Sequence, residues 1–205
     1  MIIQLARRKH QRGSSLVELM ISAMLGVILI GIVGSLFLSL QKSAKDKSLH
    51  LNLMQSLDIT LSVIKEDIQR AGYDGGLGSS LKLSGAAGTV SVSGASSIGF
   101  VYFKDGSFEN KDYRNIKYRR DGDRLLVCEE GVLTSSQIKG LSDIGSCKTL
   151  LDDGILKVNQ FSVSSAVVAN TQASSKVTTI ILGLSTLDGS LSETSTTVVK
   201  QRNWQ

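Results

Sequence analysis

The hydrophobic positions of this chain fall into three successive patterns, and the first is an unbroken apolar run. Leu19 to Leu40 are 22 residues without a charge. A helix of that length is about 33 Å long, which is enough to cross the apolar core of a bilayer. A basic segment precedes the run and no small-residue cleavage pattern follows it. The run therefore predicts an uncleaved membrane anchor with its basic end in the cytoplasm.

The second pattern is an apolar stripe that repeats every three or four residues. Its members are Leu49, Leu53, Leu57, Leu61, Ile64, Ile68 and Ala71. This spacing predicts an amphipathic helix that buries one side, and Gly72 is the expected stop. Together the two patterns predict one helix from about Ser15 to Ala71, apolar all round in its first half and one-sided in its second.

The third pattern, after the helix, is typical of β-structure. Residues 75–97 form a connection in which 16 of 23 residues are Gly, Ser or Ala, with one strand expected at Thr89–Ser93. Further strands are expected at residues 98–103, 113–119, 123–128, 155–163, 177–185 and 193–200. Asp121-Gly122 and Asp188-Gly189 are hairpin turn signals. The chain is therefore predicted to be α+β, with the amphipathic half of the helix packed on an antiparallel sheet.

Charge is concentrated at the N-terminus. Four of the five net positive charges lie in Met1–Gly13, which leaves about +1 for the rest. Nothing in the overall charge therefore indicates nucleic-acid binding. The exception is a local cluster of cations with interleaved tyrosines, formed by Lys111, Tyr113, Arg114, Lys117, Tyr118, Arg119, Arg120 and Arg124. Acids also interleave there, so a solvated hairpin is the main interpretation and a DNA contact is the alternative.

One acid, Glu18, interrupts the apolar segment near its start. A carboxylate at the centre of a membrane helix costs about 2.5–3.5 kcal/mol, and less near the end. A function and a charge partner are therefore expected for it. The stretch Gly13 to Leu19, GSSLVEL, resembles the processing site of type IV prepilins. The resemblance implies that a prepilin peptidase cuts between Gly13 and Ser14 and leaves the apolar helix attached.

Such a cut creates an α-amine at Ser14, four residues before Glu18. The resemblance implies that this amine is N-methylated, and that Glu18 pairs with the amine of a neighbouring subunit and so sets the register of assembly. In this family the mature chain usually begins with Phe or Met. Ser14 departs from that pattern, and the departure bears on methylation rather than on cleavage.

A second resemblance lies at the end of the predicted helix. The segment Ile64 to Gly76, IKEDIQRAGYDGG, resembles minor pilins of the PilW type, and the J-type minor pseudopilins of type II secretion have a related pattern. Asp67 and Arg70 are expected to pair across one turn, with Gly72 as the helix cap. The resemblance implies a type IV pilin fold with a leader peptide at 1–13, a transmembrane and filament-core helix at 14–40 and a periplasmic globular domain at 41–205.

The function that these resemblances imply is that of a minor type IV pilin that takes part in starting and assembling filaments. Its implied partners are other minor and major pilins, the prepilin peptidase, the inner-membrane assembly platform and, before assembly, membrane lipid. It would be a single-pass inner-membrane protein first and part of a pilus at the cell surface later. Two alternatives are a J-type minor pseudopilin and an anchored periplasmic binding module that does not polymerise.

The remaining candidates for chemistry are few. Cys128 and Cys147 are the only cysteines. The anchor places them outside the cytoplasm, so a disulfide is expected, with two free thiols as the alternative. After leader removal His50 is the only histidine, and no cofactor or metal motif occurs, so no enzyme, cofactor or metal site is expected. Trp204 is either a subunit anchor or a cap on the sheet.

Overall fold

The computed structural model describes residues 15–169 and 174–201. The chain divides into two compact parts, Met1–Ser48 and Leu49–Gln205. The predicted cleavage site at Gly13 and Ser14 lies outside the described residues, as does Trp204.

One helix, α1, runs from Leu16 to Arg70, within one residue of the prediction at each end. It stops where Gly72 adopts φ 86°, a left-handed conformation that suits a glycine just past a helix end. The Gly72 N–H then donates to the Val101 carbonyl at 2.8 Å, which ties the helix end to the neighbouring strand.

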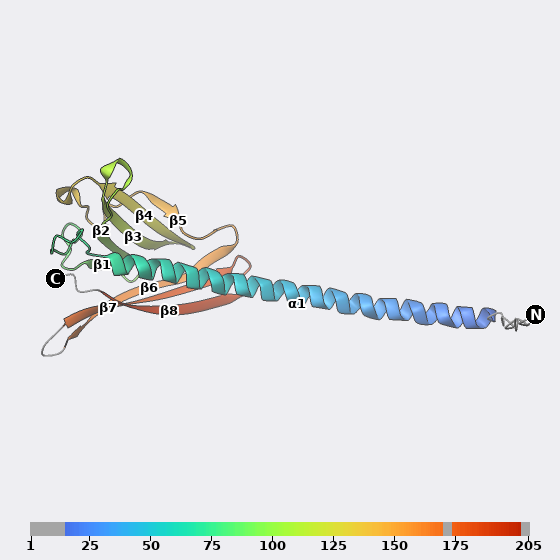
Figure 1. The fold of residues 1–205 in the computed structure, drawn as a ribbon. Helices are drawn as coiled ribbons and strands as arrows, with labels where there is room; N and C mark the ends of the chain where they lie inside the picture. Colours follow the sequence, from blue (N-terminus) through green and yellow to red (C-terminus); the bar gives the residue numbers. More distant parts are fainter. Residues whose placement is uncertain (1–14, 170–173, 202–205) are drawn as a thin grey trace, which may run out of the picture. The chain divides into compact units, whose positions relative to one another are not determined.

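The strands form two antiparallel sheets, drawn in Figure 1. The five-stranded sheet has the order β1-β2-β3-β4-β5 and the three-stranded sheet the order β6-β7-β8. The strands are β1 (Val90–Ser93), β2 (Ser97–Phe103), β3 (Tyr113–Asp121), β4 (Arg124–Val132), β5 (Cys147–Thr149), β6 (Leu156–Ala169), β7 (Ser174–Thr186) and β8 (Ser192–Lys200). Two short 3-10 helices, η1 (Phe108–Asn110) and η2 (Ser135–Gln137), lie in connections.

The antiparallel α+β architecture confirms the predicted fold, including both Asp-Gly hairpins. Gly122 joins β3 to β4 with φ 59°, and Gly189 joins β7 to β8 with φ 71°. The prediction of a single sheet is wrong, because the strands divide into two ladders. β5 was not predicted, and β2 begins inside the stretch expected to be a connection.

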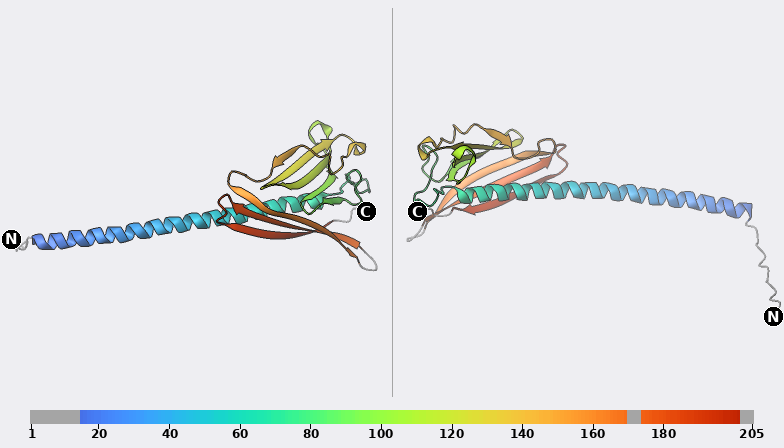
Figure 2. Two further views of the ribbon diagram at one scale, coloured as in Figure 1. Left: turned by 180° about the vertical axis from the view of Figure 1, so that it is seen from behind. Right: turned by 45° about the horizontal axis from the view of Figure 1, so that its top comes forward.

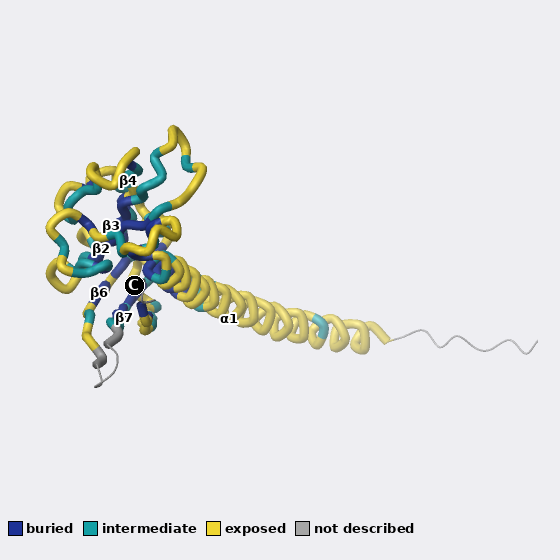
Figure 3. The backbone as a smooth tube through the Cα atoms, turned by 60° about the vertical axis from the view of Figure 1, so that its left-hand side comes forward, coloured by how far each residue is buried: buried dark blue, intermediate teal, exposed yellow. Residues whose placement is uncertain are grey.

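The second part of the chain has one main core, and the predicted helix stripe is part of it. Leu53, Leu57 and Ile64 are at most 2% exposed and pack in one cluster with residues of both sheets, such as Phe100 of β2 and Leu182 of β7. Figures 1 and 2 show the C-terminal end of α1 beside both sheets, and Figure 3 shows the buried residues gathered there.

Two main-chain bonds connect the sheets near this core. The Val158 N–H donates to the Asp123 carbonyl at 2.8 Å, and the Val163 N–H donates to the Ala95 carbonyl at 2.7 Å. Both donors belong to β6, and both acceptors lie in turns of the five-stranded sheet. One edge of β6 is therefore engaged with the other sheet rather than free.

A smaller core covers the other face of the five-stranded sheet. Leu83, Val101, Cys128 and Ile144 are buried there together. Leu83 comes from the Gly/Ser-rich connection and Ile144 from the segment between β4 and β5. The connection is therefore packed in part against the sheet, and it is more than a tether.

Candidate functional site

The N-terminal end of α1 carries the acid that the sequence singles out. Glu18 lies in the first helical turn, and its N–H donates to the Ser15 carbonyl at 2.9 Å. The Ser22 hydroxyl donates back to the Glu18 carbonyl at 2.7 Å. The Glu18 side chain is exposed, at the end of the helix where the macrodipole favours a negative charge. Its role in a charge pair with an α-amine stays a prediction, and so do cleavage and methylation at Gly13 and Ser14.

The helix surface that follows Glu18 is apolar, and no other described part of the chain covers it. Large side chains such as Met24, Ile30 and Leu38 are 70%, 75% and 66% exposed. Among the described residues, α1 is the one helix long and apolar enough to cross a membrane, judged by length and composition. This surface fits membrane anchoring.

Gly26, Gly31 and Gly34 are open positions on that apolar surface. A Cβ added at any of them would meet no atom within 4 Å. Small residues on an apolar helix allow another helix to approach closely. The three glycines are therefore compatible with tight helix packing against a neighbour.

At the other end of α1, Asp67 joins the helix to the five-stranded sheet. The Tyr118 hydroxyl of β3 donates to Asp67 Oδ2 at 2.6 Å, and Arg70 Nη1 lies 3.2 Å from Asp67 Oδ1. Burial raises the pKa of Asp67, although both partners oppose the shift. Burial, together with the nearby Asp67 charge, also raises the pKa of Tyr118. The expected Asp67–Arg70 pair is present, and Tyr118 is a partner that the sequence did not reveal.

The loop after the helix is organised around a second acid, Asp74. Its carboxylate accepts hydrogen bonds from the N–H groups of Gly76 at 3.0 Å, Leu77 at 3.1 Å and Ser79 at 2.5 Å. The Ser79 N–H is the main reason that the pKa of Asp74 is lowered. This role of Asp74 was not predicted, although an aspartate before two glycines is a sequence signal for a side chain that bonds its own turn.

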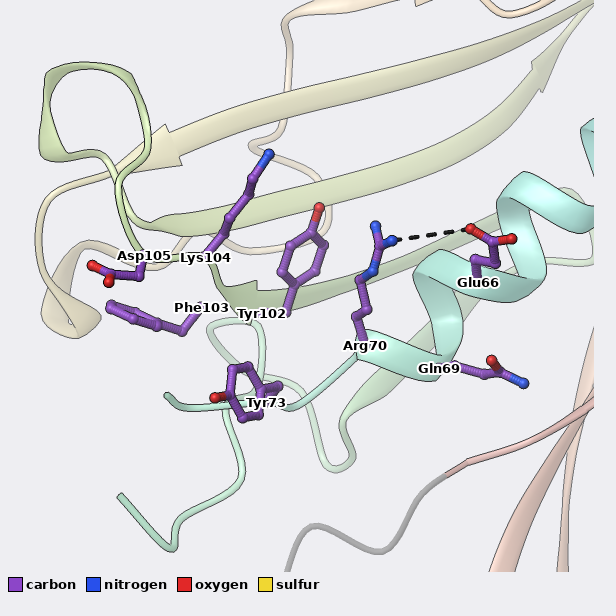
Figure 4. Close-up of a pocket in the computed structure, with 8 residues that line it drawn as sticks. All are labelled: Glu66, Gln69, Arg70, Tyr73, Tyr102, Phe103, Lys104 and Asp105. Carbon is purple, nitrogen blue, oxygen red and sulfur yellow. Dashed lines mark ion pairs between the residues drawn. The ribbon is translucent and has the colours of Figure 1, made fainter. Parts of the chain in front are cut away.

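A cavity of about 690 Å³ opens beside these two acids. It is lined by Glu66, Gln69, Arg70, Tyr73, Tyr102, Phe103, Lys104 and Asp105. Figure 4 shows Arg70 directed towards Glu66, with which it makes a 4.0 Å ion pair. The first four residues come from the segment that resembles PilW-type pilins, and the other four from the end of β2 and the residues after it. For that segment the sequence predicted a resemblance to minor pilins, an Asp67–Arg70 pair and a helix cap, but no cavity.

The disulfide between Cys128 and Cys147 closes a loop that contains residues 133–146. These residues join β4 to β5 and are here called the flap. Cys128 and Cys147 are joined by a disulfide and are direct partners across the strands. Two buried polar side chains of β3 also hold the flap: Asn115 Oδ1 accepts from the Lys139 N–H at 3.1 Å, and Lys117 Nζ donates to the Leu141 carbonyl at 3.1 Å. Burial lowers the pKa of Lys117. Neither role was predicted, because both residues lie in an apparently polar strand.

The basic cluster that suggested a DNA contact is internally neutralised. Four of its cations pair with acids: Lys111 with Glu109, Arg114 with Glu129, Arg119 with Asp121, and Arg124 with Asp153. Arg120 donates to the Gly122 carbonyl at 2.7 Å, and Lys117 is buried under the flap. This arrangement favours the interpretation as a solvated hairpin.

The side chains that most often bind metals or carry out catalysis are dispersed among the described residues. They include no group of three or more His, Cys, Asp or Glu side chains that could hold a metal ion. His50 lies on α1 with its Nδ1 3.6 Å from Glu193 Oε1 of β8, and both side chains are about two-fifths exposed, 42% and 41%. An exposed contact of this kind contributes little to stability.

Comparison with known families gives two matches. The prokaryotic N-terminal methylation motif matches residues 8–34, and prepilin peptidase-dependent protein B matches residues 46–201. No curated protein and no solved structure matches the chain. The motif, the apolar helix and the antiparallel α+β fold define a type IV prepilin-like protein. Because the second match covers more than half of the residues, the chain belongs to the family of prepilin peptidase-dependent protein B.

Proposed function

We propose that this protein is a minor type IV pilin of the PilW type, which joins other minor and major pilins to start and assemble filaments. The observation that carries the proposal is the match to the methylation motif. It spans Gly13, Ser14 and Glu18 and continues into the exposed apolar half of α1. A leader, an acid at this spacing and an uncovered apolar helix are what a subunit needs if it waits in a membrane and then packs by its helix into a filament.

Residues 1–13 are then the leader, residues 14–40 the membrane and filament-core helix, and residues 41–205 a periplasmic globular domain. The basic leader faces the cytoplasm by the positive-inside rule. The disulfide between Cys128 and Cys147 belongs in an oxidising compartment, which supports this orientation. The protein crosses the inner membrane once and later becomes part of a pilus at the cell surface.

In this proposal Glu18 acts only after cleavage. The new α-amine of Ser14 on a neighbouring subunit supplies its counter-charge in an apolar surrounding. Breaking such a pair is costly, so it selects one register between helices. The prepilin peptidase and the inner-membrane assembly platform are the partners that act before and during this step.

The test is to express the full chain with its prepilin peptidase and to measure the mass of the product. We expect loss of residues 1–13, and the same mass shift for a Ser14→Ala variant after correction for the substitution. Gly13→Val is expected to block the cut, because the peptidase site requires the glycine. An intact Met1 end, or a cut beyond Leu40, contradicts the proposal.

A second measurement distinguishes a minor pilin from a minor pseudopilin and from an anchored binding module that does not polymerise. Deleting the gene should reduce the amount of surface pili and leave protein secretion unchanged. Loss of secretion with normal pili would instead assign the chain to the J-type minor pseudopilins. A protein that is cleaved but never co-purifies with sheared filaments would be an anchored binding module.

A further inference from the structure

We propose that the cavity between the C-terminal end of α1 and the residues after β2 binds a neutral, hydroxyl-rich sugar ring. This inference goes beyond the proposed function, because assembly of a filament does not require it. The cavity of about 690 Å³ falls in the range of roughly 300–1,000 Å³ that is typical of small-molecule sites.

The charge of the cavity excludes a strongly ionic ligand. Glu66 and Asp105 contribute two negative charges, and Arg70 and Lys104 two positive charges. Arg70 is already held by Asp67 at 3.2 Å and by Glu66 at 4.0 Å. A phosphate or a polyanion would therefore meet no surplus of positive charge, and a polycation no surplus of negative charge.

The polar groups that remain can both donate and accept hydrogen bonds. Within the part of the chain that the structure describes, the side chains of Gln69, Lys104 and Asp105 make no hydrogen bond or ion pair. An ammonium group donates, a carboxylate accepts and an amide does both. Sugar hydroxyl groups also do both, so they match this set better than an apolar ligand does.

Aromatic rings supply the apolar part of the wall. Tyr73, Tyr102 and Phe103 line the cavity in Figure 4, and because Tyr102 is only 7% exposed, the half-buried rings of Tyr73 and Phe103 are the ones that a ligand can contact. One face of a pyranose ring carries mainly C–H groups and packs flat against an aromatic ring, while its hydroxyl groups point outwards to polar neighbours. The combination of aromatic rings with unengaged polar side chains is therefore suited to a sugar.

The wall is fixed before any ligand arrives. The Phe103 N–H donates to the Tyr73 carbonyl at 2.8 Å, and the Phe103 ring contacts Tyr113 edge-on with centroids 5.3 Å apart. A Cβ added to Gly75 would lie 2.9 Å from the Phe103 ring, so the loop backbone packs closely on it. A wall of this kind loses little conformational freedom on binding, which favours affinity.

The experiment is a binding titration of the full chain in lipid nanodiscs, because detergents with sugar headgroups would compete. The probes are maltose, cellobiose and N,N′-diacetylchitobiose, with heparin as the acidic comparison. We expect saturable millimolar binding of at least one neutral disaccharide and none of heparin at this site. Preference for diacetylchitobiose indicates a cell-wall glycan as the source, and preference for the hexose disaccharides indicates a surface glycan.

Variants locate the binding. Asp105→Ala and Lys104→Ala should each weaken it about tenfold, since each removes a hydrogen bond to a charged group. Phe103→Leu should also weaken it, because the flat face is lost while most of the apolar volume remains. The matched controls Asp58→Ala and Lys65→Ala remove exposed charges elsewhere on α1 and should leave the affinity unchanged.

Three outcomes overturn the proposal. They are no saturable sugar binding by the folded chain, sugar binding that Asp105→Ala and Lys104→Ala leave unchanged, and equal binding of heparin. Loss of co-purification with other pilins in these two variants, without any sugar binding, would assign the cavity to subunit packing instead.

Discussion

At the scale of single residues, the contact between Asp67 and Tyr118 joins the helix most directly to a sheet. The Asp67 side chain is only 16% exposed, and the 2.6 Å hydrogen bond crosses from α1 to β3. A partly buried carboxylate without a donor would lose water and gain nothing in return. The hydroxyl of Tyr118 therefore compensates for a burial that raises the pKa of Asp67.

Removing that hydroxyl should destabilise the globular part measurably. Tyr118→Phe is expected to lower the free energy of unfolding by about 1–3 kcal/mol at neutral pH, because a buried acceptor loses its donor. The loss should shrink as the pH falls, since a protonated Asp67 no longer needs the donor. Urea unfolding checks this, with Tyr113→Phe as the control, expected to stay within about 0.5 kcal/mol of the wild type. Equal losses for both variants would contradict the account.

Asp188, in the turn between β7 and β8, should make stability depend on acid pH. The Thr186 hydroxyl donates to its Oδ1 at 2.6 Å and the Ser190 N–H at 3.1 Å, and these bonds lower the pKa of Asp188 to about 2. An unfolded aspartate titrates near pH 3.9, so this contribution is complete above about pH 5 and is largely lost as the pH falls to about 2.

The expected result is a difference in unfolding free energy between the wild type and Asp188→Asn that is present at neutral pH and is largely lost near pH 2. Thr186→Val should reduce the same difference, because it removes the strongest donor. Chemical unfolding across this pH range measures it. A difference that does not change with pH would show that the charge of Asp188 contributes nothing to stability.

At the scale of elements, α1 serves two environments with one continuous helix. Over Leu16–Leu40 its large apolar side chains are exposed, whereas from Leu53 onwards one stripe is covered by the sheets. Burial of a leucine side chain contributes about 1.5–3 kcal/mol relative to exposure. The stripe is therefore a main source of the attachment between helix and sheets in the globular part.

Truncation on and off the stripe should separate these contributions. Leu57→Ala is expected to lower the free energy of unfolding by about 2–5 kcal/mol, because Leu57 is only 2% exposed and its truncation leaves a cavity in the core. Leu51, 57% exposed on the same helix, should change by no more than about 0.5 kcal/mol on Leu51→Ala. Thermal unfolding of the full chain checks both. Similar losses of unfolding free energy for Leu57→Ala and Leu51→Ala would show that Leu57 does not belong to a buried stripe that excludes Leu51.

The elements that were predictable from the sequence are those with a local signal. The helix follows from its periodicity and from Gly72, and two hairpins follow from Asp121-Gly122 and Asp188-Gly189. These turns specify which strands are neighbours, but they do not say which hairpins share a ladder, so the division into two sheets was missed. β5 is only three residues long, too short for a periodic signal, and it pairs with β4 where Cys147 lies opposite its disulfide partner Cys128.

The candidate sites follow the same rule. The motif around Glu18 is contiguous and could be recognised from sequence. The cavity combines Glu66 to Tyr73 with Tyr102 to Asp105, which only the fold brings together. Tyr118, Asn115 and Lys117 are similar: each lies in a strand whose polar pattern suggested solvent, and each is at least 92% buried by long-range packing. Long-range contacts of this kind leave no periodic trace in the sequence.

At the scale of the whole molecule, the apolar side chains of the first half of α1 are not covered by any other described residue and stay exposed. Exposed apolar surfaces of this extent mark membrane or protein contacts. In the proposed function this surface lies first in a bilayer and then against other subunits. Within this surface Glu18 is the one ionisable group up to Lys42. The assembled state should therefore depend on it more than the membrane-bound state does.

Glu18→Ala tests that dependence. The substitution should leave cleavage and membrane insertion intact, because the glycine and the apolar run are unchanged. It should reduce the amount of the protein in sheared pili at least tenfold, since an uncompensated amine in the helix core costs more than about 1.4 kcal/mol. Quantitative immunoblots of the membrane and filament fractions measure this. Ser22→Ala, which removes the hydroxyl bonded to the Glu18 carbonyl, is the matched control and should assemble normally. Normal incorporation of the Glu18→Ala protein would rule out the charge pair as the device that sets the register between subunits.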